Sequence, residues 1–449
     1  MKYIGKYRIC GLLGRGGMGK ILKVEHPLIG KIAALKLLDP DPLLVELIGK
    51  KKILEMFRSE AISLAGLRHP NIVEILDYDE SGAKPFYLMD YYVNNLGVMI
   101  GESRRAEQPS RKIRIEKAIY YAIQILNGLD CLHHAGIIHR DIKPYNLLVT
   151  DQDTIKICDF GLSKLRGEKF VGPPTLKFGS AWYAPPEQEE DPDSVDFSAD
   201  LYAVGITIYR MLTGVLPESG YTAVGRLNAD LDATWDDFFT KAIAANPSHR
   251  YVSAEKMRTD LLQLEAAWEA KKAQICHLPG PGKTTRADLP ISNMNPRSIC
   301  IKIDPRKAKK SFGLDNLRRP ARYLANDFAL NPDETVTDSA TGLVWQQAGS
   351  KFPITWLQAH EFIEKLNSSR FSGNLSWRLP TVAELITLLT ELPQGEDYCI
   401  ETIFDKRQKW IWSCDRRSFS AAWYVSVDMG YAAWQDFTGY CYVRAVHHI

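Results

Sequence analysis

The sequence lacks several features that would assign it to a specialised class of proteins. No apolar run approaches the roughly 20 residues that a membrane-spanning helix needs. The 56 basic and 54 acidic residues leave a formal net charge of only +2, so the charge gives no reason to expect nucleic acid as a partner. The first residues carry no apolar signal-peptide core, and Lys2 excludes N-myristoylation. We therefore expect a cytoplasmic protein without a membrane span.

Cysteine motifs, repeats and low-complexity tracts are also missing. The eight cysteines form no C-x-x-C pair and no metal-ligand spacing, which favours reduced thiols over a disulfide framework or a zinc site. The apolar fraction of 45% and the charged fraction of 24% are typical of soluble globular proteins. A chain of 449 residues is too long for one ordinary core, so two domains are expected.

The hydrophobic pattern changes its period near residue 110. Residues 1–100 contain short alternating runs typical of strands, interrupted by one helix predicted from about Leu43 to Leu67. From residue 111, apolar residues recur at intervals of three and four between Ile115 and Leu132, which predicts a buried helical stripe. The pattern indicates a mainly β small lobe followed by a mainly helical large lobe.

The segment from His139 to Asn146 and the turn Asp159-Phe160-Gly161 carry the clearest chemical signal. They place two carboxylates, an amide and a lysine on two turns that a short strand-like run, residues 154–158, separates. Phosphoryl transfer from Mg-ATP needs this set of groups: one carboxylate orients the acceptor hydroxyl, while the other carboxylate and the amide bind metal. The lysine offsets the charge of the phosphate in transfer.

These motifs resemble the catalytic core of protein kinases, and the form of the loop is similar to that of bacterial Hanks-type serine/threonine kinases. The resemblance implies that Asp141 is the catalytic base and that Lys143 stabilises the transferring phosphate. It further implies that Asn146 and Asp159 bind Mg²⁺. Lys143, followed by proline, is typical of kinases that act on serine and threonine rather than tyrosine. ATP and Mg²⁺ are the implied cofactors.

The glycine-rich segment 14–19 is weak evidence alone, because dinucleotide-binding folds use the same spacing, with Asp39 near the place of a ribose-binding acid. However, residues 20–25 alternate like a strand rather than opening a helix, which favours a hairpin loop over phosphates. Lys36 resembles the kinase lysine that binds phosphates, and Glu60 its ion-pair partner. Met89 to Tyr92 is the expected gatekeeper and hinge beside adenine. The residues expected around ATP are Gly14, Gly16, Gly19, Ile21, Lys36, Glu60, Met89, Asp90 and Tyr92.

The kinase resemblance continues downstream and implies structural and regulatory roles. Glu187 is expected to pair with Arg250, and Asp200 to hold the backbone of the catalytic loop. Arg140 beside Asp141 indicates a basic pocket that a phosphorylated loop neutralises, with Thr175 as the expected phosphosite. Ser180 is expected to position substrate instead. Pro185 stands where the family usually has alanine, which stiffens the turn.

The resemblance covers residues 5–268, and the expected kinase domain has these bounds. Residues 269–320 contain proline, glycine and a basic run, and we interpret them as a linker; a nucleic-acid site is the less favoured interpretation of the run. Residues 298–303 are a candidate strand of the domain that follows. Seven of the ten tryptophans lie in that last domain, residues 321–449.

Three segments of residues 321–449 resemble the Lcl C-terminal family, whose fold is similar to C-type lectins and to the formylglycine-generating enzyme. They are residues 333–346, 376–385 and 442–446. Helices are predicted at residues 354–367 and 381–392, with short aromatic strands elsewhere. We expect at least half of the tryptophans to be core; the functional alternative is ligand capture by exposed Trp and Tyr rings between residues 410 and 442. The spacing of Cys399, Cys414 and Cys441 does not match the reactive cysteine pair of the formylglycine-generating enzyme.

The predicted fold class is thus α+β, with a bilobal kinase fold followed by a C-type-lectin-like α+β domain. The favoured function is a serine/threonine protein kinase whose last domain binds a ligand or a protein substrate. One alternative is a pseudokinase scaffold that binds partners without transfer. A third hypothesis gives the last domain its own enzymatic activity, which a redox-active cysteine there would support.

Overall fold

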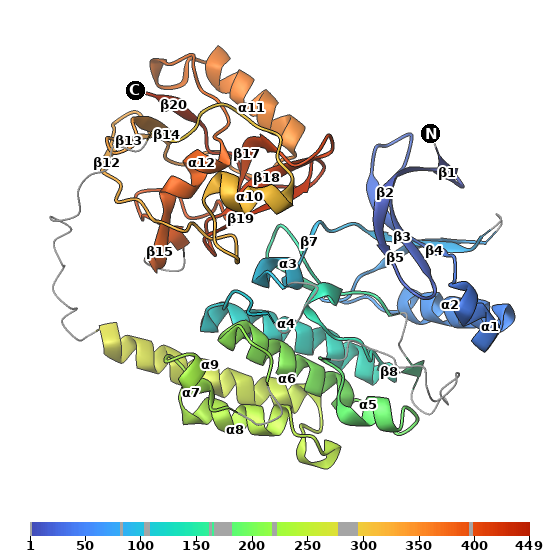
Figure 1. Cartoon of the computed structure of the whole chain (residues 1–449). Coiled ribbons are helices and arrows are strands. Elements are labelled where there is room, and N and C mark those ends of the chain that lie inside the picture. The colour runs from blue at the N-terminus through green and yellow to red at the C-terminus, as the bar shows by residue number, and fades with distance from the viewer. Residues whose placement is uncertain are drawn as a thin grey trace. The chain divides into compact units, whose positions relative to one another are not determined.

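The chain divides into two compact units, Met1–Leu278 and Pro279–Ile449, each of which mixes helices with antiparallel strands. The computed structural model shown in Figure 1 describes residues 2–80, 84–102, 108–160, 164–165, 182–217, 222–276, 295–394 and 398–449. Each unit has a core of its own. The α+β class predicted from the sequence is confirmed in both units.

The first unit begins with a twisted antiparallel sheet and a helix pair. The six strands lie in the order β1-β2-β3-β4-β6-β5. The elements are β1 (Tyr3–Ile4), β2 (Tyr7–Arg15), β3 (Gly19–Glu25), β4 (Ile32–Leu38), α1 (Pro42–Ile48), α2 (Lys50–Ala65), β5 (Ile75–Asp79) and β6 (Phe86–Asp90). The single helix predicted over residues 43–67 is therefore wrong in one respect: it is divided at Gly49, whose φ of +87° only glycine adopts readily.

The second part of this unit is mainly helical, and helices α4 and α6 form its buried centre. Two small sheets, β10-β9-β7 and β11-β8, carry the loops of the candidate site (Figure 1). The helices are α3 (Leu96–Ile100), α4 (Ile115–His134), α5 (Pro186–Glu190), α6 (Ser198–Thr213), α7 (Val224–Leu227), α8 (Ala233–Ala242) and α9 (Ala254–Cys276). The strands are β7 (Asn94–Asn95), β8 (Ile137–Ile138), β9 (Leu147–Val149), β10 (Ile155–Ile157) and β11 (Lys164–Leu165), and 3-10 turns occur at Pro144–Asn146 and Pro247–His249.

The second unit surrounds its core with three small antiparallel sheets and three helices of the described range. The sheets have the orders β12-β13-β14-β20, β15-β16 and β17-β18-β19. Its helices are α10 (Pro305–Phe312), α11 (Trp356–Ser368) and α12 (Val382–Leu385), with 3-10 turns at Phe371–Gly373 and Ile386–Leu388. Its strands are β12 (Phe328–Leu330), β13 (Thr335–Asp338), β14 (Leu343–Gln346), β15 (Leu389–Gln394), β16 (Tyr398–Ile400), β17 (Trp410–Arg416), β18 (Ala421–Ser426), β19 (Tyr431–Asp436) and β20 (Val446–His448). The helix predicted over residues 381–392 is shorter than expected, because residues 389–394 pair as a strand.

The segment predicted as a linker, residues 269–320, is corrected by the structure at both ends. Helix α9 continues to Cys276 as part of the first unit. Helix α10, by contrast, packs Ala308 and Phe312 into the core of the second unit, while its basic residues lie on the other side. The second unit therefore begins well before residue 321. The candidate strand at residues 298–303 is only an isolated bridge between Lys302 and Arg416.

The cysteine prediction is also corrected in this segment. Cys300 and Cys414 form a disulfide that joins the start of the second unit to β17. Arg297 reinforces the same junction, because its guanidinium donates to both carboxylate oxygens of Asp415 at 3.0 and 2.7 Å. Cys399 and Cys441 are buried in the second unit. In the described part of the chain, no helix combines the length and the apolar character required to cross a bilayer.

Candidate active site

The loop between β8 and β9 holds Asp141 in a fixed and largely buried position. Lys143 Nζ donates to Asp141 Oδ2 at 2.7 Å, and Asn146 Nδ2 donates to the same oxygen at 2.9 Å and to the Asp141 carbonyl at 2.8 Å. The Asp141 amide donates to His139 Nδ1 at 3.2 Å. The predicted catalytic and metal-binding residues of this loop thus form one cluster of hydrogen bonds.

Asp200, in the first turn of α6, anchors the backbone of this loop. Its carboxylate is fully buried and accepts the backbone N–H groups of His139 and Arg140 at 2.9 and 2.8 Å. His133 Nε2 lies 2.9 Å from the same carboxylate. Burial alone would raise the pKa of Asp200, but these partners outweigh burial and hold the pKa below its ordinary value. Arg140 adopts a φ of +67°, which the two backbone hydrogen bonds stabilise.

A second turn brings Asp159 beside the catalytic loop. The strand β10 ends at Ile157, and the following amide of Cys158 donates to the carbonyl of Asn146 at 3.0 Å. His139 Nε2 lies 3.1 Å from the Cys158 carbonyl, which ties the two turns together again. Asp159 has a φ of +63° and a side chain that is 39% exposed, so its carboxylate remains available to a ligand.

Lys36 lies between two carboxylates. Its Nζ is 2.7 Å from Glu60 Oε1 and 3.6 Å from Asp159 Oδ1. Burial alone would lower the pKa of Lys36, but the negative charges around it dominate and raise the pKa well above its ordinary value. Lys36 in turn contributes to holding the pKa of Asp159 below its usual range, against the opposing effect of burial. Both groups are therefore charged at neutral pH.

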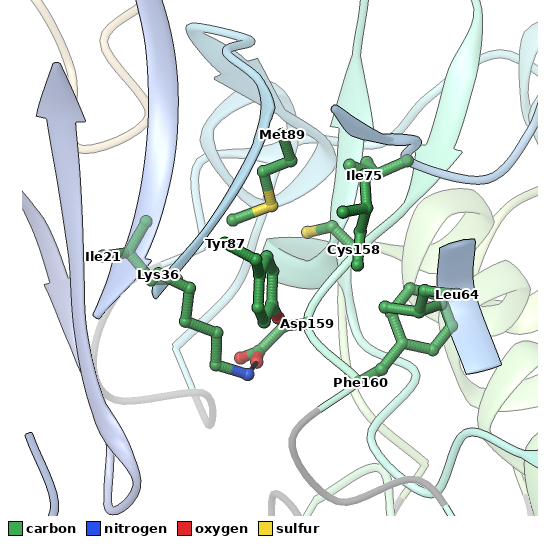
Figure 2. A pocket seen from close by; sticks show the side chains of 10 residues that line it. Ile21, Lys36, Leu64, Ile75, Tyr87, Met89, Cys158, Asp159 and Phe160 are labelled. Atoms are coloured by element: carbon green, nitrogen blue, oxygen red, sulfur yellow. Dashed lines mark ion pairs between the residues drawn. The ribbon is translucent and has the colours of Figure 1, made fainter. Parts of the chain in front are cut away.

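A cavity in the first unit opens next to this lysine. Figure 2 shows Lys36 reaching from β4 toward the Asp159 carboxylate, with apolar side chains along the other walls. The lining residues are Ile21, Lys36, Leu64, Val73, Ile75, Tyr87, Met89, Cys158, Asp159 and Phe160. A cavity with apolar walls and a charged end fits a ligand that joins a flat apolar ring to anionic groups.

The glycine-rich segment forms the hairpin predicted for it. Strands β2 and β3 pair antiparallel on either side of it, and the amides of Gly16 and Gly19 each donate to the carbonyl of the other. A Cβ at Gly19 would lie 2.0 Å from the carbonyl oxygen of Leu37, whereas at Gly14 and Gly16 it would meet nothing within 4 Å. The lack of a side chain at Gly19 thus permits β3 to pack closely against β4. Gly14 and Gly16, by contrast, border open space.

The other residues that the sequence pointed to fall into three groups: one pairs with lysines, two lie next to the cavity, and three lie outside the described residues. Asp39 forms ion pairs with Lys20 and Lys84 on the surface, so it does not act as a buried ribose-binding acid. Asp90 ends β6 next to the lining residue Met89, and Tyr92 follows two residues later; neither lines the cavity. The predicted phosphosite Thr175, Ser180 and Gly161 lie outside the described residues.

The structural pair predicted downstream is present. Arg250 donates to both carboxylate oxygens of Glu187 at 2.6 and 2.8 Å, and also to the carbonyls of Ala244 and Ala245. Pro185 precedes helix α5 with a φ of −73°, which a proline ring already favours. Arg140 Nη2 donates to the carbonyl of Pro192 at 2.7 Å, so its side chain has a structural role in addition to the predicted regulatory one.

The groups present suit a hard divalent cation held together with a phosphate. Asn146 and Asp159 supply oxygen atoms, which Mg²⁺ prefers. The described residues contain no cluster of three or more His, Cys, Asp or Glu side chains that could hold a metal by themselves. Mg²⁺ commonly binds through one or two protein oxygens and completes its shell with water and substrate phosphates, so two ligands are sufficient here.

Two residues of the site were not identified from the sequence. Tyr87 lines the cavity, and its hydroxyl donates to Glu60 Oε1 at 2.9 Å. Gln188 Nε2 donates to the carbonyl of Arg140 at 2.9 Å and so supports the catalytic loop from α5. Tyr87 belongs to an apolar strand, and no sequence pattern distinguishes a tyrosine that bonds to a helix from one that only packs.

In the second unit, the tryptophans are mostly core, as expected. Six of the seven are buried, and Trp434 alone among them is only partly buried. The alternative of a ring surface between residues 410 and 442 therefore loses Trp410, Trp412 and Trp423. What remains is the partly buried Trp434 and Tyr442, together with Tyr440, which is 51% exposed. The Trp434 ring lies 4.2 and 4.8 Å from the guanidinium groups of Arg318 and Arg417.

Comparisons with known proteins agree with this division. The profile of the protein kinase domain family matches residues 7–265, and that of the Lcl C-terminal domain matches residues 334–447. A probable serine/threonine-protein kinase of Clostridium perfringens is 29% identical over 274 residues, which cover 58% of this chain and 38% of that protein. The serine/threonine-protein kinase PknB of Mycobacterium tuberculosis is 32% identical over 283 residues, which cover 58% and 43%. The chain thus spans about two fifths of the length of these relatives.

A crystal structure of the Mycobacterium tuberculosis PknI kinase domain is similar with a TM-score of 0.45 and 24% identity, over 58% of this chain and 96% of that one.

Proposed function

The chain belongs to the protein kinase domain family, and on that premise we propose that it transfers the γ-phosphoryl group of ATP to serine and threonine hydroxyls of proteins. The observation that carries the proposal is the position of Lys36, 2.7 Å from Glu60 and 3.6 Å from Asp159 at the charged end of the cavity. A reaction that consumes Mg-ATP favours the cytoplasm as its location.

The cavity supports ATP as the donor. Ile21 and Met89 offer apolar surface for adenine next to the hinge formed by Asp90 and Tyr92. The buried ammonium group of Lys36 offers a fixed positive charge for the phosphates. The hairpin at Gly14, Gly16 and Gly19 would cover the phosphates from the small lobe, because its glycines offer backbone N–H groups without a Cβ.

The transfer itself requires a base next to the acceptor hydroxyl. Asp141 orients the serine or threonine hydroxyl and accepts its proton as the new phosphorus–oxygen bond forms. The bond between the γ-phosphorus and the β–γ bridging oxygen breaks, and the electron pair leaves with ADP. Lys143, already 2.7 Å from Asp141, offsets the negative charge of the transferring group. Mg²⁺, which Asn146 and Asp159 would hold, neutralises phosphate charge when it is bound.

Incubation with radiolabelled Mg-ATP and a generic protein substrate tests the proposal. We expect Asp141→Asn and Lys36→Met to lower phosphate incorporation by at least about a hundredfold, because one removes the base and the other the phosphate contact. Asp151→Asn, an exposed carboxylate in the turn after β9, is the matched control and should equal the wild type. Equal incorporation by all four proteins would reject phosphotransfer and favour the pseudokinase scaffold.

We also propose that phosphorylation of the loop preceding Tyr183 activates the kinase. Phosphorylation of Thr175 would add a dianion, and the basic Arg140 beside the catalytic base is the group expected to neutralise it. Mass spectrometry of the protein incubated with Mg-ATP should find phosphate on Thr175, and Thr175→Ala should lower activity. Unchanged activity and autophosphorylation of the variant would exclude this residue as the activating site.

For the second domain, we propose recruitment of protein substrates through the partly buried Trp434 and its two guanidinium neighbours. This face favours acidic segments, because it combines positive charge with an aromatic surface. Arg417 is exposed, so Arg417→Ala should lower transfer to casein, an acidic protein, more than transfer to histone, while the exposed Lys351→Ala should change neither. Equal effects on both substrates would argue against the recruiting role.

A further inference from the structure

One oxygen atom of Glu60 receives two hydrogen bonds from the neighbouring sheet. Lys36 Nζ reaches Glu60 Oε1 at 2.7 Å, and the hydroxyl of Tyr87 donates to the same atom at 2.9 Å. The second oxygen, Oε2, is buried and has no hydrogen-bond partner within the described residues. The orientation of this carboxylate therefore depends on the lysine and the tyrosine together.

The sheet register explains why these two side chains meet. Lys36 on β4 and Tyr87 on β6 are direct cross-strand partners, so both side chains project from the same face of the sheet. Figure 2 shows the Tyr87 ring beside the Lys36 side chain at the charged end of the cavity. The ammonium group lies 5.7 Å from the ring centroid. Both side chains are more than nine-tenths buried.

Tyr87 also makes apolar contacts with the helix that carries Glu60. Its ring lies 5.2 Å from the ring of Phe57, one turn earlier on α2, and both belong to the cluster that includes Ile53 and Ala61. Burial and the nearby carboxylate raise the pKa of Tyr87 well above its ordinary value, so the hydroxyl stays a donor at neutral pH. The tyrosine thus attaches α2 to the sheet by packing and by a polar bond.

We propose that Tyr87 is a positioning residue for ATP binding: its hydroxyl fixes the Glu60 carboxylate, which in turn holds Lys36 where the phosphates bind. This inference rests on the proposed kinase function. Without the hydroxyl, Lys36 is the remaining donor to Glu60 Oε1, and the carboxylate can turn away with the lysine. The lysine then has to be repositioned each time ATP binds, and part of the binding free energy is lost.

The inference predicts a specific kinetic signature for Tyr87→Phe. The ring and its packing against Phe57 remain, and only the hydroxyl is removed. Because Lys36 contacts ATP before as well as during transfer, its loss of position should act mainly on binding. We expect KM for ATP to rise about tenfold, equivalent to about 1.4 kcal/mol, with kcat within about twofold of the wild type. KM for the protein substrate should not change.

Tyr78 provides a matched control on the adjacent strand. It is the cross-strand partner of Tyr87 in β5, its ring also lies near Phe57, at 6.4 Å, and its hydroxyl donates to a carboxylate, that of Glu80. That carboxylate lies on the surface away from the cavity. Tyr78→Phe should therefore leave KM for ATP unchanged. An equal rise of KM in both variants would show a general effect of tyrosine removal and overturn the inference.

A double-mutant cycle distinguishes positioning from general stabilisation. ATP affinity is measured by equilibrium binding for the full chain carrying Tyr87→Phe, Lys36→Met or both. If the hydroxyl acts through the lysine, Tyr87→Phe weakens binding in the wild type but not in the Lys36→Met protein. A similar weakening in both backgrounds would assign Tyr87 a purely structural role. A wild-type protein that binds ATP but transfers no phosphate would reject the kinase proposal alone, since the cycle reads only binding.

Discussion

Replacement of Asp200 by asparagine removes the charge that anchors the catalytic loop. The carboxylate accepts the backbone N–H groups of His139 and Arg140 and contacts the His133 ring, all within 2.9 Å. An asparagine keeps one acceptor oxygen and presents an NH₂ group to donors. A hydrogen bond to a charged group contributes about 1.5–3 kcal/mol, and each orphaned buried donor costs about 1–3 kcal/mol. We therefore expect a loss of about 3 kcal/mol in the free energy of unfolding.

This loss has thermal and kinetic consequences that can be measured. For a unit of this size, 1 kcal/mol shifts Tm by about 2–4 °C, so the first unit of Asp200→Asn should melt about 6–12 °C lower by calorimetry. The catalytic base should be displaced, and a misplacement of about 1 Å costs roughly a hundredfold in rate. Asp196→Asn is the control: it is exposed and accepts one backbone N–H, from Ser198.

The stability that the Asp200 carboxylate contributes should depend on pH in a defined direction. The folded-state pKa of Asp200 lies below its unfolded value of about 3.9, so its contribution to stability is complete above that value. The contribution is lost as the pH falls through the lower folded-state pKa. The stability difference between wild type and Asp200→Asn should be present near neutral pH and shrink in stronger acid, as the pH falls through the folded-state pKa of Asp200. A variant that melts within about 1 °C of the wild type with unchanged kcat would refute the anchoring role.

Three further outcomes follow from other contacts. Arg250→Ala should destabilise the first unit by about 3–5 kcal/mol in denaturant, because it leaves Glu187 largely buried without its partner; a loss below about 1 kcal/mol would contradict this. Cys300→Ser should lower the stability of the second unit by about 2–4 kcal/mol, and a reductant should destabilise the wild type but not the variant. Hydrogen bonds from two lysines lower the pKa of Asp39 to about 2, which NMR titration can verify; a value near 4 would mean that these surface pairs do not form in solution.

The parts of the site that lie in short sequence windows were predictable. From His139 to Asn146 the functional groups are covalent neighbours, so their spacing alone indicates a shared chemistry. Both family resemblances are confirmed by the matched profiles. Glu60 is 24 residues from Lys36, and its pairing was expected only because the family pattern implied it. The role of Tyr87 required the strand register, which no local pattern contains.

The boundary of the second unit was mispredicted for a physical reason. Helix α10 has eight residues, of which only Ala308 and Phe312 are buried. Two apolar side chains four residues apart within a basic run are too few to distinguish a packed amphipathic helix from a solvated tether. The disulfide between Cys300 and Cys414 likewise spans 114 residues, and spacing over such a distance predicts no pairing. Both the packing of α10 and the disulfide depend on contacts with β17 and its neighbouring strands, which lie far away in the sequence.

The tryptophans of the second unit show why composition does not by itself identify a binding surface. Much of this unit lies outside its short strands and helices, so a few large side chains have to fill its interior. Trp423 does so in contact with Phe312 and with the edge of Trp434, at centroid distances of 5.1 Å each. Trp434 therefore supports the core through one contact and faces two guanidinium groups through others. For that reason Arg417→Ala is a cleaner test of recruitment than removal of the indole, which would disturb folding and binding together.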